Sequence, residues 1–376
     1  MTKHNPANER IKREYLGFLT DAQGRDAATT DRVAASLARF EASTRAKHFN
    51  TFHREQAVAF KAKLSERVNV RTGERLSKAT VHSTLRDLRS FFIWLAREPG
   101  YKSRIAYSDA DYFNLSGKDT AIAHARRDKA APTVEQVACV LAVMAAETAL
   151  QRRDRALVAF AALTGARVGA LASFQFGHVD LAGGYVEQDA RTVRTKAAKS
   201  FRTYFMPFVP GALEVFAEWI AELRGDLWGP GDPLFPATQM GLGADGGFEA
   251  AGLSRKGWAT TTPVREIFKR AFAVADLPYF NPHSFRDTLV HHGMRLNLTP
   301  EAMKALSQNI GHAHVLTTLT SYGQVPTHRQ GELIRGLTTN GVEKGPPDAI
   351  ASMEALLASL KAGAMPSPSP SFPAGG

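Results

Sequence analysis

The segment Pro282–Gln324 carries the most informative residues in the second half of this chain. It reads PHSFRDTLVHHGMRLNLTPEAMKALSQNIGHAHVLTTLTSYGQ. His283 and Arg286 lie three residues apart at the expected start of a helix, and residues with this spacing share a helix face. The segment therefore predicts an imidazole and a guanidinium on one side of the same helix.

A second helix and a tyrosine follow within the same segment. Thr299 is a typical N-cap and Pro300 suits the first helical position, while Gly311 ends the helix just before His312. Tyr322 comes ten residues after His312. No cysteine or carboxylate set in the same register would complete a metal site, so these residues indicate an anion with a nucleophile beside it.

An arginine and a lysine-containing segment upstream could bind the same anion. An apolar helix that must be buried runs from Arg155 to Leu163, and the turn at Gly165 then presents Arg167, whose planar fork suits two oxygens of one phosphate. Further on, residues 195–199 read TKAAK and lie between two strand-like runs.

Together these fragments resemble the tyrosine recombinases, the phage integrase family. The matching motifs are Thr-Gly-x-Arg, a hairpin lysine, His-x-x-Arg, Gly-His and a Thr-rich segment ending in Tyr, in this order over about half of the chain. The family more often has nine positions from the histidine to the tyrosine, where this chain has ten. The resemblance implies catalytic roles for Arg167, Lys196 or Lys199, His283, Arg286, His312 and Tyr322.

The choice between the two lysines stays open. The local pattern Thr195-Lys196 favours Lys196 narrowly, whereas Lys199 lies eight residues before Pro207, a spacing that the family also shows.

The resemblance also implies a reaction. Tyr322 would attack the scissile phosphorus of double-stranded DNA, leaving a 3′-phosphotyrosyl link and a free 5′-hydroxyl, with no metal and no nucleotide cofactor. A homotetramer on paired DNA sites is expected. The alternatives are a type IB topoisomerase, which relaxes supercoils, and a non-catalytic DNA-binding protein.

Length and charge indicate two domains of different character. The chain has 376 residues, too many for one ordinary core. Residues 1–130 contain 25 Lys and Arg against 15 Asp and Glu, a net charge of +10, whereas residues 131–376 contain 22 against 21, a net charge of +1. A basic first third suits a module that holds a polyanion.

Hydrophobic periodicity predicts four helices in the first third. The clearest begins after the N-cap Ser77 and repeats apolar residues from Val81 to Leu95. The apolar faces form a core, and the opposite faces carry basic residues expected to meet DNA phosphates. These are Lys61, Lys63, Lys78, Arg86 and Arg89. In the linker 115–131, Arg126, Arg127 and Lys129 either touch the DNA backbone or are solvated.

The predicted fold is mainly α, with a small antiparallel β-sheet within residues 178–207 of the second domain. By resemblance it is a two-domain DNA clamp, with a helical core-binding domain at 1–114, a linker at 115–131 and a catalytic domain at 132–340. Residues 341–376 are expected to form a short helix and a disordered tail. The Gly-rich stretch 241–252 is expected to be a mobile insertion, too irregular to be a phosphate-cradling loop.

Composition also bears on location. Cys139 is the one cysteine, so no internal disulfide can form. The sequence contains neither a signal segment nor an apolar run of about 18 residues. A cytoplasmic protein without a membrane segment is expected.

Overall fold

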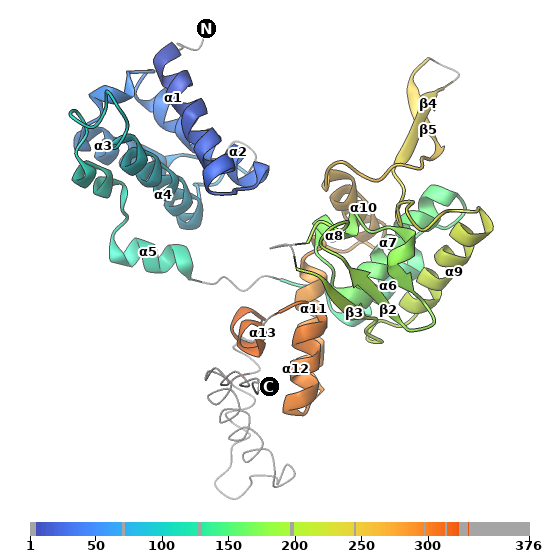
Figure 1. The fold of residues 1–376 in the computed structure, drawn as a ribbon. Helices are drawn as coiled ribbons and strands as arrows, with labels where there is room; N and C mark the ends of the chain where they lie inside the picture. Colours follow the sequence, from blue (N-terminus) through green and yellow to red (C-terminus); the bar gives the residue numbers. More distant parts are fainter. Residues whose placement is uncertain are drawn as a thin grey trace, which may run out of the picture. The chain divides into compact units, whose positions relative to one another are not determined.

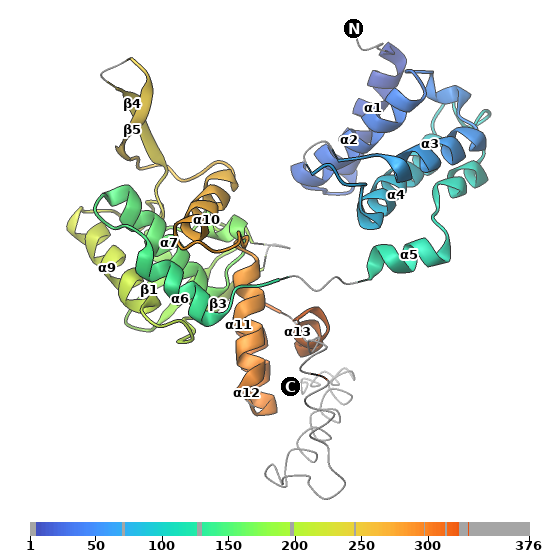
Figure 2. The same ribbon diagram turned by 180° about the vertical axis from the view of Figure 1, so that it is seen from behind.

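The structure is a computed structural model. It describes residues 5–69, 72–125, 130–195, 199–243, 246–296, 298–312, 314–322 and 330, and of residues 320–322 the backbone alone. The chain falls into two compact units, Met1–Asp128 and Lys129–Gly376 (Figures 1 and 2). The division lies within the segment 115–131 that the sequence suggests as a linker.

Unit 1 contains the four helices that periodicity predicts. They are α1 (Pro6–Gly17), α2 (Ala27–Ser43), α3 (Arg54–Glu66) and α4 (Lys78–Leu95). Ser77 caps α4 as expected, because its side chain accepts a hydrogen bond from the backbone N–H of Thr80 at 3.2 Å. A π-helical turn (Phe18–Ala22) extends α1, and 3-10 turns lie at Phe49–Thr51 and Tyr107–Phe113.

Aromatic side chains fill the core of unit 1. Phe40, Phe92 and Phe113 are almost fully buried, and the rings of Phe52 and Phe92 stack with their centroids 3.8 Å apart. Such rings bury a large apolar area, so they dominate the stability of a small helical core.

The linker prediction for residues 115–131 needs one correction. Part of this segment is a regular helix, α5 (Gly117–His124), capped by Ser116. It packs on α4, where Lys78 forms a 2.9 Å ion pair with Asp119. No residue of α5 is buried, so the helix has no apolar stripe by which its period could be read from the sequence.

Unit 2 is built from further helices and two small sheets, as Figure 1 shows. The larger sheet is antiparallel with the order β1-β2-β3, and the smaller is a two-stranded ribbon. The predicted class, mainly α with a small antiparallel sheet, is confirmed. The elements are α6 (Val134–Val143), α7 (Ala149–Thr164), α8 (Val168–Leu171), β1 (Val179–Asp180), β2 (Tyr185–Gln188), β3 (Phe201–Tyr204), α9 (Ala212–Gly225), β4 (Thr238–Leu242), β5 (Phe248–Leu253), α10 (Thr262–Val274), α11 (Ser284–Arg295), α12 (Pro300–Asn309) and α13 (Val315–Tyr322).

Helix α7 forms the centre of unit 2. Every residue from Ala156 to Thr164 is buried, and the helix packs against α6, α9, α10 and α11. Gly165 ends it in the left-handed conformation, with φ of 57°, where glycine carries no Cβ penalty. The turn that carries Arg167 therefore directly follows a fully buried helix of the core.

The expectation of irregular structure in the Gly-rich stretch 241–252 is wrong for residues 241–242 and 248–252, which lie in strands. These residues belong to the hairpin of β4 and β5, which projects from unit 2 as a narrow arm (Figures 1 and 2). Burial does not alternate along these strands, and Leu242 and Phe248 are about four-fifths exposed, at 76% and 80%. Because a strand is recognised by alternating polarity, the sequence carries no signal for this ribbon.

Within the described residues, no helix combines the length and the apolar character needed to cross a membrane.

Candidate active site

Arg286 lies in the first turn of α11 and is buried, with 2% of its surface exposed. One guanidinium nitrogen, Nη1, donates a 2.9 Å hydrogen bond to the carbonyl of Gly165, and Nη2 donates to the carbonyl of Ile310. The first carbonyl belongs to the turn that leads to Arg167, and the second to the turn that leads to His312. Arg286 therefore joins two turns that are far apart in the sequence.

Arg167 occupies the N-cap position of α8 and is half-buried. Its side chain makes no hydrogen bond or ion pair with any residue that the structure describes. A guanidinium held on a rigid turn with its donors unused suits an anion with two oxygens.

His312 follows the end of α12 and is 8% exposed. Its Nδ1 lies 2.8 Å from the hydroxyl of Thr318, which donates to the hydroxyl of Ser307 at 2.7 Å. The pKa of His312 is lowered to about 4. Burial is the largest cause, and the positive charges of Arg286 and Arg167 and the electrostatic effect of His283 follow in that order. The imidazole is therefore neutral at neutral pH.

Three other predicted site residues interact electrostatically with His312. Arg286, Arg167 and His283 all act on its charge, so the structure brings these four predicted residues into one neighbourhood. His283 stands at the N-cap of α11 and is exposed.

Of the two candidate hairpin lysines, only Lys199 lies within the described residues. Lys199 is exposed just before β3 and lines an open groove of about 710 Å³ together with Asn309, Gly311 and His312. Lys196 lies outside the described residues. One of the two candidates is thus placed beside His312.

Polar contacts between α12 and β3 build the wall of this groove. The side chain of Asn309 accepts from the backbone N–H of Tyr204 at 2.7 Å and donates to its carbonyl at 2.9 Å. The hydroxyl of Thr203 donates to the backbone carbonyl of Asn309 at 3.0 Å. Gly311 has φ of 73°, and a Cβ there would collide with the ring of Phe201. These contacts fix His312 relative to the strand that follows the lysines.

Tyr322 is the last residue of α13. It comes one helical turn after Thr318, the buried residue that contacts His312. The side chain of Tyr322 lies outside the described part of the structure.

Sequence reasoning missed the residues that support the site. Ser307, Asn309 and Thr318 form its hydrogen-bonded framework. A polar residue on an expected apolar face is the one available signal, and it does not identify the partner. His292, one of the adjacent histidines of α11, packs against the ring of Phe208 at a centroid distance of 4.9 Å. Among the described residues, no group of three His, Cys, Asp or Glu side chains could hold a metal ion.

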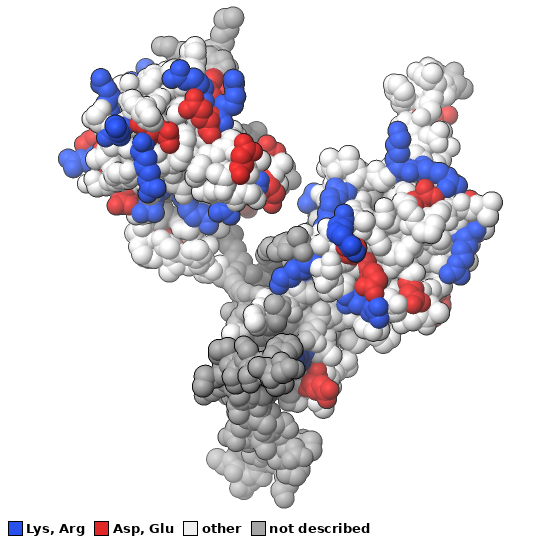
Figure 3. Space-filling view, viewed as in Figure 1, with Lys and Arg blue, Asp and Glu red and all other residues white. Residues whose placement is uncertain are grey.

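Several basic residues expected to meet DNA have partners within unit 1. Lys61 donates to the backbone carbonyls of Tyr112 and Asn114, at 3.0 and 2.8 Å, and Arg89 pairs with Asp111 at 2.8 Å. Figure 3 shows cations and carboxylates interspersed on the visible face of this unit. Lys78 is paired as described above, Lys63 and Arg86 are exposed, and Arg126, Arg127 and Lys129 lie outside the described residues.

Comparison with known proteins shows the family of the chain. The sequence model of the phage integrase family matches residues 133–329, a range that contains every candidate catalytic residue. No curated protein matches the chain.

Solved structures with a similar fold include three DNA complexes. A lambda integrase (75–356) dimer bound to a COC′ core site has a TM-score of 0.57 and 12% identity, covering 84% of this chain and 94% of that one. The XerH site-specific recombinase bound to palindromic difH substrate has a TM-score of 0.57 and 16% identity, covering 88% and 84%. The Tn1549 transposon integrase with transposon right end DNA has a TM-score of 0.56 and 13% identity, covering 87% and 99%.

Proposed function

The chain belongs to the phage integrase family, the tyrosine recombinases, and we propose that it is a site-specific recombinase or integrase acting through a 3′-phosphotyrosine intermediate. One observation carries the proposal. Arg286 hydrogen-bonds to the turns that carry Arg167 and His312, and His312 contacts Thr318 on the helix that ends at Tyr322. Arg286, Arg167 and His283 all act electrostatically on His312.

The two arginines would bind the scissile phosphate. Charge develops on the non-bridging oxygens during attack, and fixed donors in a water-poor site stabilise it. Arg167 has its donors available within the described structure, whereas Arg286 is positioned by the carbonyls of Gly165 and Ile310. Arg167 is thus the principal phosphate fork, and Arg286 adds charge while holding both turns.

Tyr322 would be the nucleophile. Its hydroxyl oxygen forms a bond to phosphorus, and the bond from phosphorus to the 5′ oxygen breaks. The leaving oxygen takes a proton from the hairpin lysine, for which Lys199 beside His312 and Lys196 are both candidates. Attack by another 5′-hydroxyl on the phosphotyrosyl link reverses these steps and joins a different strand.

The histidines would handle the proton of the tyrosine. His312 is neutral at neutral pH because of its burial and its cationic neighbours, so it would accept a hydrogen bond from the tyrosine hydroxyl, and the proton itself would be transferred to His283. His283 is exposed and would pass the proton to solvent.

Double-stranded DNA would be the partner, and four protomers would act on paired sites as a homotetramer in the cytoplasm. The basic excess of unit 1 supports its assignment as the DNA-holding domain, with the partition 1–114, 115–131 and 132–340 suggested by the sequence. The expected C-terminal helix at residues 348–361 and the tail lie outside the described residues. We further propose that this helix docks on a neighbouring protomer, with docking on its own domain as the alternative.

Trapping of the covalent intermediate tests the reaction. A pool of nicked duplexes of random sequence, in which cleavage releases a short strand, is incubated with the protein, and DNA joined to protein is recovered and sequenced. We expect adducts through a 3′ end at a defined sequence. Tyr322→Phe should abolish them while leaving DNA binding nearly intact, and an equal yield from this variant would contradict the assignment.

The same assay distinguishes the alternatives. Adducts at scattered sites with relaxation of supercoiled plasmid would favour a type IB topoisomerase. Binding without any adduct would favour a non-catalytic protein.

A further inference from the structure

The connection between α2 and α3 in unit 1 has an unusual backbone. Arg45 and Ala46 both adopt φ of 56°, in the left-handed region that non-glycine residues rarely occupy. Such a conformation persists only where its surroundings determine it, and it is found preferentially at functional sites.

A buried polar network holds this connection. Asn5 donates to the carbonyl of Ala46 at 3.0 Å, and Asn8 donates to the carbonyl of Lys47 at 2.9 Å and to the carboxylate of Glu41 at 2.8 Å. Asn8 is fully buried and also accepts from the backbone N–H of Phe49 at 3.0 Å.

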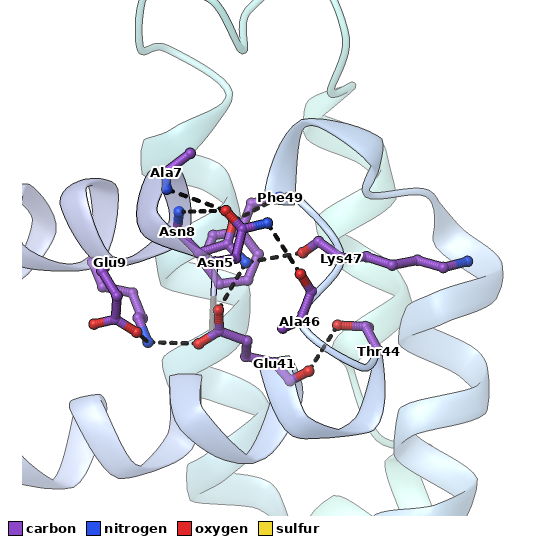
Figure 4. Close-up of polar contacts among 10 residues, drawn as sticks. Asn5, Ala7, Asn8, Glu9, Glu41, Thr44, Ala46, Lys47 and Phe49 are labelled. Carbon is purple, nitrogen blue, oxygen red and sulfur yellow. Dashed lines mark hydrogen bonds and ion pairs between the residues drawn. The ribbon is translucent and has the colours of Figure 1, made fainter. Parts of the chain in front are cut away.

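Lys12 completes the network. Its ammonium lies 2.5 Å from the other carboxylate oxygen of Glu41 and also pairs with Glu9. The negative charge of Glu41 is thus used inside the unit. As Figure 4 shows, the backbone of Lys47 is tied to the network while its side chain extends away from it.

The side chains that the connection presents border a small cationic groove. Arg45, Lys47 and Lys63 line a groove of about 250 Å³, together with Ser43, Thr44 and Gln56. No carboxylate is among the lining residues. The side chains of the three cations make no ion pair or hydrogen bond with another residue in the described part of the chain.

These cations differ from most of those that the sequence suggested. Lys61, Lys78 and Arg89 already have acceptors within unit 1, so moving them to a phosphate would leave those acceptors unpaired. Binding at Arg45, Lys47 and Lys63 breaks no such contact. The fixed connection also reduces the ordering that binding would require.

We propose that the groove of Arg45, Lys47 and Lys63 binds a backbone phosphate of duplex DNA, with Asn8 and Glu41 as positioning residues for the connection. This inference rests on the proposed function for its ligand and adds a defined contact point on unit 1. Three cations around one small groove suit one phosphate group rather than three separate ones.

The test measures binding of the full chain to a fluorescein-labelled 40-base-pair duplex of mixed sequence over a range of salt concentrations. The groove variant is Arg45→Gln/Lys47→Gln/Lys63→Gln. The control, Lys102→Gln/Arg104→Gln/Lys118→Gln, removes the same charge from exposed residues of unit 1 outside this groove. We expect the groove variant to bind about tenfold more weakly, with the slope of log K against log salt reduced by about 1, and the control to change less than about twofold.

The number of phosphates is tested by a double-mutant cycle between Lys63→Gln and Arg45→Gln/Lys47→Gln. If the cations share one phosphate, the losses are not additive and the slope falls by about 1 in total. A fall by about 2 or more would contradict a single shared phosphate. Competition with inorganic phosphate should weaken wild-type binding more than the same ionic strength of chloride, and should lose this excess effect in the groove variant.

Two outcomes would overturn the inference while leaving the proposed function intact. Wild-type DNA binding by the groove variant would exclude the groove as a DNA contact, and an equal loss in the control would show that net charge alone matters. A wild-type protein that neither binds the duplex nor forms a covalent adduct would overturn both the inference and the proposed function.

Discussion

Replacing each of the two site arginines by lysine should separate support of the fold from catalysis. Arg286→Lys keeps the positive charge, but a single ammonium nitrogen cannot occupy the positions of Nη1 and Nη2, which reach the carbonyls of Gly165 and Ile310. At least one buried carbonyl then loses its donor. Arg167→Lys leaves no described carbonyl or carboxylate without a partner, because the side chain makes no such contact.

The magnitudes follow from these contacts. A buried acceptor left unpaired costs about 1 to 3 kcal/mol, and bonds to charged groups are at the upper end, so Arg286→Lys should lower the free energy of unfolding of unit 2 by about 2 to 4 kcal/mol. Arg167→Lys should change it by less than about 0.5 kcal/mol. Both variants should lose about 10²- to 10³-fold in the rate of strand cleavage. Arg167→Lys loses the two-pronged phosphate geometry, whereas Arg286→Lys releases the turns that carry Arg167 and His312.

Urea unfolding and single-turnover adduct formation measure the two effects. Trp219, Trp228 and Trp258 report on unit 2, and replacing Trp94 by Phe removes the tryptophan of unit 1. Arg295→Lys, an exposed position at the end of α11, is the matched control and should leave both quantities unchanged. The reasoning is refuted if Arg286→Lys is as stable as wild type, or if Arg167→Lys is destabilised to the same extent.

Three further changes test other parts of the structure. Because the pKa of His312 is lowered to about 4 in the folded chain, only the unfolded chain binds a proton at this residue as the pH falls below about 6.5. The free energy of unfolding of unit 2 should therefore keep its full value above pH 6.5 and fall by up to about 3 kcal/mol by pH 4. His312→Gln should reduce this loss. Gly311→Ala should destabilise unit 2 by about 2 to 4 kcal/mol through the left-handed φ and the Phe201 ring, whereas Gly184→Ala, with positive φ but open space, should cost about 1 kcal/mol in the same urea titration. Ala46→Gly should raise the thermal unfolding midpoint of unit 1. Removing the strain of a left-handed non-glycine residue stabilises the folded unit by about 1 to 2 kcal/mol, which exceeds the free energy cost of the entropy that glycine adds to the unfolded chain. A lower midpoint would contradict the strain argument.

Most of the helices could be predicted from the sequence because their burial is either periodic or continuous over many residues. Helix α4 has a buried stripe from Val81 to Leu95, and α7 is buried continuously from Ala156 to Thr164. Helix α5 and the β4–β5 ribbon could not be predicted, since neither buries one face. Elements that lie on a surface do not leave a hydrophobic period in the sequence.

The candidate site shows a similar division. The motifs named Arg167, His283, Arg286 and His312, and the structure brings these residues together. They gave no indication that Arg286 would be occupied by two carbonyls, or that Asn309 would pair with the backbone of Tyr204. Contacts between a side chain and a distant backbone depend on the folded geometry alone, so no spacing in the sequence announces them.

The basic residues of unit 1 illustrate why charge alone is a poor guide to a binding surface. Lys61 and Arg89 were chosen because they lie opposite an apolar stripe, yet both have partners within the unit. Arg45 and Lys47 lie on a connection whose left-handed backbone depends on Asn8, which is 39 positions before Lys47 in the chain. Which cations remain available for a phosphate is therefore decided by the acceptors around them, a property of packing.

Arg286 makes stability and catalysis inseparable at one position. Its guanidinium donates to the carbonyl that precedes the Arg167 turn and to the one that precedes His312. Any change that moves Arg286 moves the phosphate fork and the neutral imidazole together, so a loss of cleavage at this residue cannot be attributed to its charge alone. Arg167 has no such structural contact in the described chain. A loss of cleavage at Arg167 without loss of stability therefore isolates the contribution of a guanidinium to the transition state.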